Sequence, residues 1–328
     1  ALTSAASALR ASGVIARGEN ALEALSRATH LVFDKTGTLT GGRLEIRRVV
    51  PVNDCEPEHA LAVAAALQQY SGHPVAGAFA GIEPARGMTP LGQRVGAGIE
   101  GAREGSRFRI GSESYCRKLA PDLPSPPLEP LYWVAVCEEN RALAWVGLSD
   151  PLRPEAVAVV EEAVQAGLQV ELLTGDSSAQ GPELAAQLGI STVNTGMQPE
   201  QKMQHVRQLQ SAGAVVAMVG DGLNDAPVLA LADASFAVAG ATDLARTEAD
   251  FVIAGGDLRQ VPYTWRKARQ CRRIIKQNLG WALCYNLAAI PLAACGLVPP
   301  WAAALGMSCS SLLVVLNSLR LNGRPRET

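Results

Sequence analysis

Three aspartates stand out because each one closely follows a short apolar run of residues. They are Asp34 after His30–Phe33, Asp176 after Leu168–Leu173, and Asp221 after Ala214–Val219. Carboxylates are hard oxygen ligands that suit Mg²⁺, and an aspartate can also act as a nucleophile. A single aspartate in such a place is usually a turn or helix-cap residue. Three of them in one pattern favour a shared site instead.

The elements around these aspartates alternate between strands and helices over residues 27–262. Helices are expected at Pro154–Ala166, which has Gly167 just past its end, and at Pro199–Ala212. Such alternation predicts a parallel sheet with right-handed crossover connections. Ligands of these sheets bind beyond the carboxyl ends of the strands, which is where the three aspartates fall.

One long segment, from Val49 to Ala144, interrupts this alternation. It has a helical pattern over Pro57–Tyr70, a proline-rich stretch over Pro121–Pro130 and a hairpin-like pair of strands around Glu138–Arg141. We interpret it as an inserted second domain.

The overall composition narrows the classes of function. The 328 residues include 29 Lys and Arg against 31 Asp and Glu, so the formal net charge is −2 and a nucleic-acid partner is not expected. Only 18% of the residues are charged and 48% are hydrophobic. This excludes disorder as the main state and suggests that some apolar surface faces lipid. The seven cysteines form no CxxC pair, which favours a reducing compartment.

The last fifth of the chain contains two charge-free segments, residues 279–298 and 299–319. Each is about 20 residues long, enough for a helix to cross a hydrocarbon core of ~30 Å. Basic residues flank the pair on both outer sides: Arg266, Lys267, Arg269, Arg272, Arg273 and Lys276 before it, and Arg320, Arg324 and Arg326 after it. The positive-inside rule then predicts a transmembrane hairpin with both ends in the cytoplasm. The alternative is a pair of helices buried in a soluble core.

The run Asp34-Lys35-Thr36-Gly37-Thr38-Leu39-Thr40 resembles the phosphorylation motif of P-type ATPases, which have the haloacid dehalogenase-like fold. The resemblance extends over nearly the whole chain, through Thr174-Gly175-Asp176, Lys202 and the run Gly220-Asp221-Gly222-Leu223-Asn224-Asp225-Ala226-Pro227. It implies that Asp34 accepts a phosphoryl group from ATP. The implied catalytic set is Asp34, Lys35, Thr36, Thr174, Gly175, Asp176, Lys202, Asp221, Asn224 and Asp225.

Within this set, Mg²⁺ is expected at Asp34, the Thr36 carbonyl and Asp221, because all three offer hard oxygen ligands. Asp225 is expected to be structural or to orient the metal. Phosphatases of the fold carry a second aspartate two residues after the nucleophile as a general acid and base, and here that residue is Thr36. The aspartyl phosphate should therefore be long-lived, which suits a pump. The phosphoryl oxygens would be steadied by Lys202, Thr174 and Asn224.

The inserted domain contains Ser71-Gly72-His73-Pro74 and, further on, Gly96-Ala97-Gly98-Ile99-Glu100-Gly101. The glycine pattern alone is weak evidence for a dinucleotide fold, and Arg107–Gly111 after it looks like a strand rather than a helix. With the His-Pro pair, it resembles the nucleotide-binding domain of heavy-metal P-type ATPases. The chain departs from that family at Gly72, where glutamate is usual, and at Gln68, where an acidic adenine contact is common. The implied ATP contacts are His73, Pro74, Gly96, Gly98, Gly111 and Ser112, the last in place of asparagine.

Both charge-free segments carry side chains similar to the transport-site residues of Cu⁺-exporting ATPases. They are Tyr285-Asn286 in the first segment and Met307, Ser310 and Ser311 in the second. The resemblance implies Cu⁺ ligands at Tyr285, Asn286, Met307 and Ser311, and a soft ion such as Cu⁺ does favour thioether and thiolate ligands. Zn²⁺ pumps of the same branch generally place a Lys or Asp here, and neither segment has one. The alternative is that Met307 fills apolar space and the serines ease helix packing.

Together these observations predict an α/β protein. It would consist of a haloacid dehalogenase-like phosphorylation domain with an inserted α+β nucleotide-binding domain, followed by two transmembrane helices. The expected limits are 1–26 for a stalk after a membrane helix, 27–48 and 145–262 for the phosphorylation domain, 49–144 for the nucleotide-binding domain, 263–278 for a basic juxtamembrane helix, and 279–320 for the membrane pair.

The expected function is ATP-driven export of Cu⁺ from the cytoplasm through an aspartyl phosphate on Asp34, with Mg²⁺ and ATP as cofactors. The chain would be a multi-pass integral membrane protein, expected in a bacterial inner membrane with its catalytic domains in the cytoplasm. Its partners would be ATP, Cu⁺, membrane lipid, and a copper chaperone or acceptor. The family's Cys-Pro-Cys motif and the TGE motif of its actuator domain do not occur in this sequence. The N-terminal part of a pump is therefore a further expected partner, and this chain alone should not transport.

Three alternatives remain open. One is a soluble haloacid dehalogenase-like phosphatase. Another is a P-type pump for Zn²⁺, Cd²⁺ or Ag⁺. The last is a non-catalytic regulator that binds nucleotide.

Overall fold

The computed structural model describes the chain except for residues 18, 177–179, 222–224, 239–246 and 323–328. The chain divides into two compact units. The first contains Ala1–Leu39, Pro154–Ser177 and Gly181–Thr328, and the second contains Thr40–Arg153.

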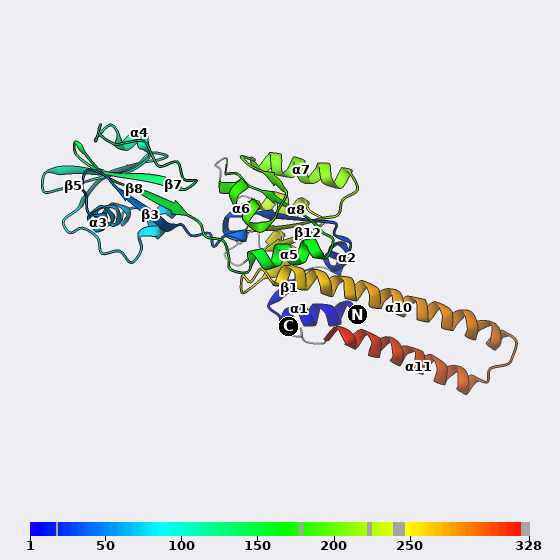
Figure 1. The fold of residues 1–328 in the computed structure, drawn as a ribbon. Coiled ribbons are helices and arrows are strands. Elements are labelled where there is room, and N and C mark those ends of the chain that lie inside the picture. The colour runs from blue at the N-terminus through cyan, green and yellow to red at the C-terminus, as the bar shows by residue number, and fades with distance from the viewer. Residues whose placement is uncertain (18, 177–179, 222–224, 239–246, 323–328) are drawn as a thin grey trace. The chain divides into compact units, whose positions relative to one another are not determined.

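A seven-stranded sheet is the centre of the first unit (Figure 1). In spatial order its strands are β1 (Val14–Ala16), β13 (Phe251–Ile253), β12 (Ala234–Ala237), β11 (Val216–Gly220), β2 (His30–Asp34), β9 (Gln169–Leu173) and β10 (Thr192–Asn194). All neighbours pair in parallel except β1 and β13. The central strands are apolar along most of their length, as expected for strands that are buried on both faces. The predicted α/β fold with a parallel sheet is therefore confirmed.

Helices precede or connect these strands. They are α1 (Leu2–Ala11), α2 (Glu19–Arg27), α5 (Ala156–Gln165), α6 (Gln180–Leu188), α7 (Pro199–Ser211) and α8 (Ala226–Leu231). Helix α7 has Pro199 in its first turn, where a missing N–H is tolerated, and the Gln198 N–H donates to the Gln201 side chain at 2.8 Å. Its buried face carries Lys202 and Val206. This start and this face set where the Lys202 side chain enters the first unit.

A six-stranded antiparallel sheet forms the second unit. In spatial order its strands are β3 (Glu45–Pro51), β8 (Arg141–Ser149), β7 (Tyr132–Glu138), β6 (Ser106–Gly111), β5 (Gly98–Arg103) and β4 (Thr89–Arg94). Helix α3 (Pro57–Gln68) packs its Leu67 into a core with Val146, and the short helix α4 (Glu113–Cys116) packs its Cys116 into another with Trp145. Because Trp145 and Val146 are adjacent in β8, the two helices cover opposite faces of the sheet.

The limits of the second unit lie outside the expected 49 and 144. Strand β3 begins at Glu45 and β8 runs on to Ser149, and the two strands pair from Glu45 with Ser149 to Pro51 with Ala144. Cutting the chain at 49 and 144 would divide both strands. The sheet therefore moves both limits outward.

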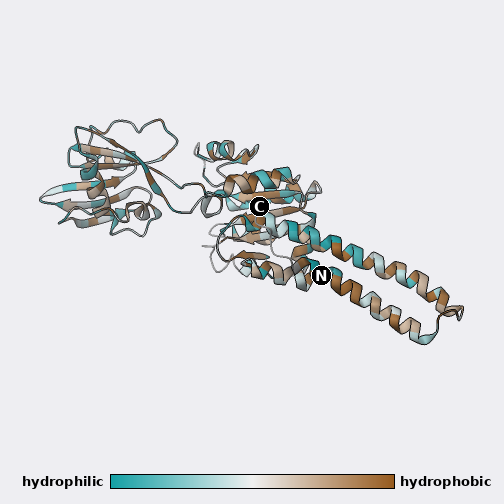
Figure 2. Ribbon diagram, turned by 60° about the horizontal axis from the view of Figure 1, so that its bottom comes forward, coloured by the Kyte–Doolittle hydropathy of each residue, from teal (hydrophilic) through white to brown (hydrophobic). Residues whose placement is uncertain are grey.

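Helices α10 (Gln260–Ala294) and α11 (Pro300–Leu319) form a long hairpin (Figure 1). The first part of α10 is packed against α2, with Val261, Trp265 and Cys271 buried. Beyond Ile274, apolar side chains are mostly exposed, and Figure 2 shows hydrophobic residues along the outer part of the hairpin. The large exposed ones include Leu279, Leu283, Leu287, Ile290, Leu305, Leu312 and Leu316.

Among the described residues, α11 is the one helix that is long and apolar enough to cross a membrane. The first predicted span, 279–298, does not form a separate helix of this kind. It is the end of α10, which contains Asn286 and stops at Ala294, and residues 295–299 lead to α11. The basic segment 263–278, predicted as a juxtamembrane helix, is likewise continuous with α10.

Candidate active site

The end of β2 places Asp34 between two neighbouring strands. In the parallel register, Asp34 lies beside Leu173 of β9, and Phe33 lies beside Val219 of β11. The segments that leave β9 and β11 therefore flank Asp34. A cavity of about 420 Å³ opens here, and its lining includes Asp34, Thr36, Thr174, Gly175, Asp176, Lys202, Asp221 and Asp225. The structure thus brings eight of the ten predicted catalytic residues to one cavity.

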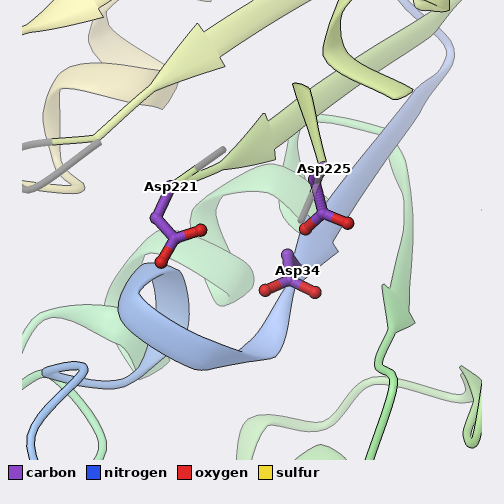
Figure 3. Close-up of side chains that lie close together, drawn as sticks. All are labelled: Asp34, Asp221 and Asp225. Carbon is purple, nitrogen blue, oxygen red and sulfur yellow. The ribbon is translucent and has the colours of Figure 1, made fainter. Parts of the chain in front are cut away.

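Three carboxylates converge in this cavity (Figure 3). Asp34, Asp221 and Asp225 each offer an oxygen atom, and these oxygens lie within 4.8 Å of one another. The residues are 7%, 7% and 1% exposed, respectively. Buried carboxylates repel one another, and their oxygens are the ligands that Mg²⁺ prefers. The cluster therefore fits the Mg²⁺ predicted at Asp34 and Asp221, and it adds Asp225 to the candidate ligands.

Lys202 brings a positive charge to the cluster from α7. Its Nζ donates to Asp34 Oδ1 at 2.7 Å and to Asp225 Oδ1 at 2.8 Å, and the residue is 4% exposed. Burial raises the pKa of Asp34 to about 7; repulsion by Asp225 adds to this, and Lys202 opposes it. Burial lowers the pKa of Lys202, but the two carboxylates outweigh that effect and its pKa is raised overall. Lys202 therefore remains an ammonium, and it holds the nucleophile candidate in place.

The turn after β2 depends on glycine. In the tight turn Lys35–Leu39, Gly37 has a φ of +71°, and a Cβ at this position would collide with the carboxylate of Asp221. Thr36, just before it, is extended and lines the cavity. The absence of a side chain at Gly37 thus lets the turn that carries Thr36 approach the acidic cluster.

Lys35 and Asp176 link the loops after β2 and β9 by an ion pair. The N–H of Asp176 also donates to Thr174 Oγ1 at 3.1 Å, and Thr174 is buried. These contacts fix the side chains of Thr174 and Asp176, two of the predicted catalytic residues, at the wall of the cavity. Asn224, which was predicted to steady a phosphoryl oxygen, lies outside the described residues.

Asp225 has a more central place than the sequence suggested. It precedes α8, and its backbone carbonyl accepts from the N–H groups of Val228 and Leu229 at 2.9 and 2.8 Å. Its side chain lies in the cluster, where it receives the second hydrogen bond of Lys202. From the sequence, the position of Asp225 four residues after Asp221 suggests the start of a helix. It does not indicate a contact with Lys202 on another helix.

The second unit has a cavity of its own, of about 220 Å³. Five of the six predicted nucleotide contacts line it: His73, Gly96, Gly98, Gly111 and Ser112. The sixth, Pro74, begins a short 3₁₀ turn, Pro74–Phe79. His73 caps this turn, because its Nδ1 accepts from the Val75 N–H at 3.3 Å, and both residues line the cavity.

Strands β5 and β6 approach closely at one wall of this cavity. Gly98 pairs with Gly111. A Cβ on Gly98 would collide with the Ile110 carbonyl oxygen, and a Cβ on Gly111 would collide with the Ala97 carbonyl oxygen. Glycine at both positions lets the two backbones pair this closely, and the two residues line the cavity without side chains. The G-x-G-x-x-G run continues as strand β5 and not as a helix, which agrees with the rejection of a dinucleotide fold.

Gln68 is a residue that the sequence reasoning left out of the ATP contacts. It ends α3, is 7% exposed and lines the same cavity. Among the described residues its Oε1 has no hydrogen-bond partner. A buried acceptor without a donor costs about 1–3 kcal/mol, so a ligand N–H at this place would be favoured.

The predicted Cu⁺ residues lie on α10 and α11. The hydroxyl of Tyr285 lies so close to Gly306 that a Cβ there would be 2.6 Å from it, so Tyr285 is at the contact between the helices. Asn286, Met307 and Ser311 are exposed, and no hydrogen bond joins these four side chains in the described part of the chain. The two helices alone therefore do not close a metal site around them.

Comparison with known proteins places these features in context. The family profile of the haloacid dehalogenase-like hydrolases matches residues 28–233. A probable copper-transporting ATPase of Synechococcus elongatus, SynA, is 37% identical over 324 residues, which cover 94% of this chain and 41% of that protein. A probable copper-exporting P-type ATPase V of Mycobacterium tuberculosis is 37% identical over 332 residues, which cover 96% and 43%. The chain thus spans less than half the length of these curated relatives.

Solved structures give the same grouping. The structure of a zinc-transporting PIB-type ATPase in its E2.Pi state has a TM-score of 0.84 and 30% sequence identity to this chain. The match covers 98% of this chain and 54% of that one. The similarity therefore includes both units and the helical hairpin.

Proposed function

The chain belongs to the haloacid dehalogenase-like hydrolases and, among them, to the heavy-metal P-type ATPases, and we propose that ATP phosphorylates its Asp34 in a cycle that exports Cu⁺ from the cytoplasm. The observation that carries this proposal is the buried Asp34 carboxylate at the end of β2, bound by the Lys202 ammonium beside two further carboxylates. This arrangement supplies a nucleophile, a cation and a place for a second cation within one cavity.

The chemistry requires those charges. Phosphoryl transfer to a carboxylate brings two anions together, so positive charge must lie at the reacting oxygens. An Asp34 oxygen would form a bond to the γ-phosphorus while the bond to the β–γ bridging oxygen breaks and ADP leaves. Lys202, 2.7 Å from Asp34 Oδ1, is placed to neutralise part of the charge on the transferred group. A Mg²⁺ held by Asp34, the Thr36 carbonyl and Asp221, with Asp225 beside them, would supply the remaining charge neutralisation.

Thr36 favours a pump over a phosphatase. It lines the cavity two residues after Asp34, where phosphatases of the fold have an aspartate. A threonine hydroxyl is not a general base at neutral pH, so it cannot activate a water molecule against the aspartyl phosphate. A long-lived phosphoenzyme is therefore expected, and this is what separates the proposal from a soluble phosphatase.

The nucleotide is proposed to bind in the cavity of the second unit. His73 stands at its edge, the Gly98–Gly111 pair forms a side-chain-free wall, and Gln68 offers a buried acceptor. Adenine has an exocyclic amino group that can donate to such an acceptor. The cavity thus combines a flat wall with one polar group, as ligand pockets generally do.

The hairpin is proposed to cross a membrane with both of its ends in the cytoplasm. Its support is the run of exposed apolar side chains along α11 and the outer part of α10, and the basic residues that precede them. In water this surface would be costly, at about 25 cal/mol per Å². The same surface argues against the soluble alternatives, a phosphatase and a nucleotide-binding regulator. A multi-pass location in a bacterial inner membrane is part of the proposal.

Cu⁺ is proposed as the cargo because of the thioether of Met307 and the absence of charge from both segments. Tyr285, Asn286 and Ser311 would complete its site together with helices from the rest of a pump. The two curated relatives are named for copper, whereas the solved structure is named for zinc. Zn²⁺, Cd²⁺ and Ag⁺ therefore stay as alternative cargoes.

The N-terminal part of a pump, membrane lipid and a copper chaperone or acceptor are the proposed partners. Hydrolysis of the aspartyl phosphate is assigned to an actuator domain in that part. The chain alone is accordingly expected to form a phosphoenzyme but to move no metal. Cu⁺ uptake by vesicles that contain only this chain would contradict this expectation.

Labelling with γ-³²P-ATP and Mg²⁺ tests the proposal on the full chain in a neutral detergent. An acid-stable, hydroxylamine-sensitive phosphoenzyme should accumulate, and the Asp34→Asn variant should not form it. Asp54→Asn, at a residue outside both cavities, is the matched control and should label like the unchanged chain. Rapid release of phosphate without an accumulated intermediate would instead favour the soluble phosphatase.

A further inference from the structure

A third cavity, of about 280 Å³, has a lining that shares no residue with the linings of the other two. It is formed where α2 meets α10, close to the start of α1. Its apolar lining includes Leu22 and Ile275, and its charged lining consists of Glu23, Arg27, Arg272 and Lys276. None of these residues has a part in the phosphoryl-transfer or metal sites described above.

The charge in this cavity is not balanced. Glu23 forms an ion pair with Arg27, one helical turn along α2. Within the described part of the chain, neither Arg272 nor Lys276 has a carboxylate within 4 Å. Other cations of α10 do have partners, since Arg266 pairs with Glu162. The cavity thus holds two positive charges with no protein counter-charge, which is the electrostatic requirement for an anionic ligand.

The position of these cations along α10 indicates which anion is available. The charge-free segment begins at Leu279, three residues after Lys276 and seven after Arg272. At 1.5 Å per residue along the helix axis, Lys276 and Arg272 lie about 4.5 and 10.5 Å before the start of the apolar segment. Lipid phosphates occupy this depth, and basic pockets beside membrane helices on the cytoplasmic side bind anionic headgroups.

We propose that this cavity binds the phosphate-bearing headgroup of an anionic membrane lipid. The Arg272 guanidinium can donate two parallel hydrogen bonds to a phosphate, and Lys276 adds a point charge on the same side of the helix, one turn away. Ile275, which is 38% exposed, and Leu22 offer apolar contact to the glycerol and the first acyl carbons. The proposal rests on the proposed membrane position of the hairpin. It adds a lipid that binds at a defined place on the chain.

Binding of soluble short-chain lipids to the full chain in a neutral detergent tests this directly. Dihexanoyl phosphatidylglycerol is the probe, and dihexanoyl phosphatidylcholine and inorganic phosphate are the comparisons, measured by calorimetry. We expect the phosphatidylglycerol to bind more tightly than either comparison. Arg272→Gln should weaken phosphatidylglycerol binding about tenfold, as the loss of a charge-assisted hydrogen bond predicts. Lys276→Gln should weaken it in the same direction.

Arg273→Gln is the matched control, because Arg273 is adjacent on the same helix, carries the same charge and does not line the cavity. It should change the affinity less than twofold. Equal losses in Arg272→Gln and Arg273→Gln would overturn the proposal in favour of a diffuse basic surface. Equal binding of inorganic phosphate would overturn the lipid assignment. Melting temperatures of the variants show whether they are folded.

Two parallel measurements separate this proposal from its premise. Flotation of the chain with phosphatidylcholine vesicles in 1 M salt reports membrane insertion without surface electrostatics, and phosphoenzyme formation reports the site at Asp34. Loss of flotation would remove the premise and with it the lipid proposal. A failure of phosphorylation with specific lipid binding retained would contradict the proposed function alone.

Discussion

Replacing Lys202 with methionine removes the charge at the centre of the acidic cluster while it keeps most of the side-chain length. Lys202 Nζ now binds Asp34 and Asp225 at 2.7 and 2.8 Å in a buried place. Removing one partner of a buried ion pair leaves an uncompensated charge and costs about 3–5 kcal/mol. For a domain of this size, that lowers the melting temperature by roughly 6–20 °C. The rate of phosphoenzyme formation should fall by about 10²–10³, as when a charge-stabilising donor is removed.

The loss of stability should depend on pH. The pKa of Asp34 is raised by burial from 3.8 to about 7 even with Lys202 present, and without Lys202 it should rise further. The folded state then binds more protons than the unfolded state above pH 4, so stability falls as the pH rises through that range. At pH 6 the variant can protonate Asp34 and avoid the unpaired charge. Lys202→Met should therefore be more destabilising, relative to the unchanged chain, at pH 8 than at pH 6.

Thermal unfolding in Mg²⁺-free buffer at the two pH values measures this effect. Lys118→Met, at an exposed lysine of the second unit, is the matched control and should leave the melting temperature unchanged. In the double variant Lys202→Met, Asp225→Asn, one of the repelling carboxylates is gone, so part of the stability should return. A Lys202→Met chain that melts like the unchanged chain at both pH values would refute the electrostatic account of the cluster.

Two further predictions concern the cavity of the second unit. Gln68→Leu removes a buried acceptor that has no donor in the described structure, so the melting temperature should stay the same or rise. The dissociation constant for ATP should rise about five- to tenfold, because a hydrogen bond of about 1 kcal/mol is lost. An unchanged dissociation constant would exclude Gln68 as a nucleotide contact. Gly98→Ala places a Cβ against the Ile110 carbonyl, so it should destabilise the chain by about 1–3 kcal/mol and weaken ATP binding. Gly92→Ala has open space around its Cβ and should have neither effect. Thermal unfolding and nucleotide titration compare the two variants.

The sequence was sufficient to predict the parallel sheet and the convergence of Asp34 with Asp221. Both aspartates follow apolar strands, and carboxyl ends of parallel strands share one edge of a sheet. The outer strand β3 was harder to predict, because its sequence from Glu45 to Pro51 has two adjacent arginines and little burial. Its place is fixed by pairing with β8, nearly one hundred residues further on, and such long-range pairing is not encoded in a local pattern.

The hairpin shows a different limit of sequence reasoning. Charge is absent from 279 to 319, so a search for charge-free runs finds no boundary within this segment. Dividing it into two spans of about 20 residues places the boundary at residue 298. Helices end for backbone reasons instead: α10 stops at Ala294, Gly296 adopts a φ of +72°, and α11 begins at Pro300. The limits of an apolar segment and of a helix are therefore set by different physical causes, and only the second sets which side chains face each other.

Asp225 shows why the acidic cluster could be predicted only in part. Strand-end positions identify Asp34 and Asp221 from the sequence, but Asp225 belongs to the start of α8 and reads as a helix cap. Its role depends on Lys202, which reaches it from α7 and binds Asp34 with the same ammonium. One cation shared by two carboxylates makes the charge of each depend on the other, so Asp225 raises the pKa of Asp34 although it is 191 positions away in the sequence. Residues of this kind are found through the contact between two helices and not through any spacing along the chain.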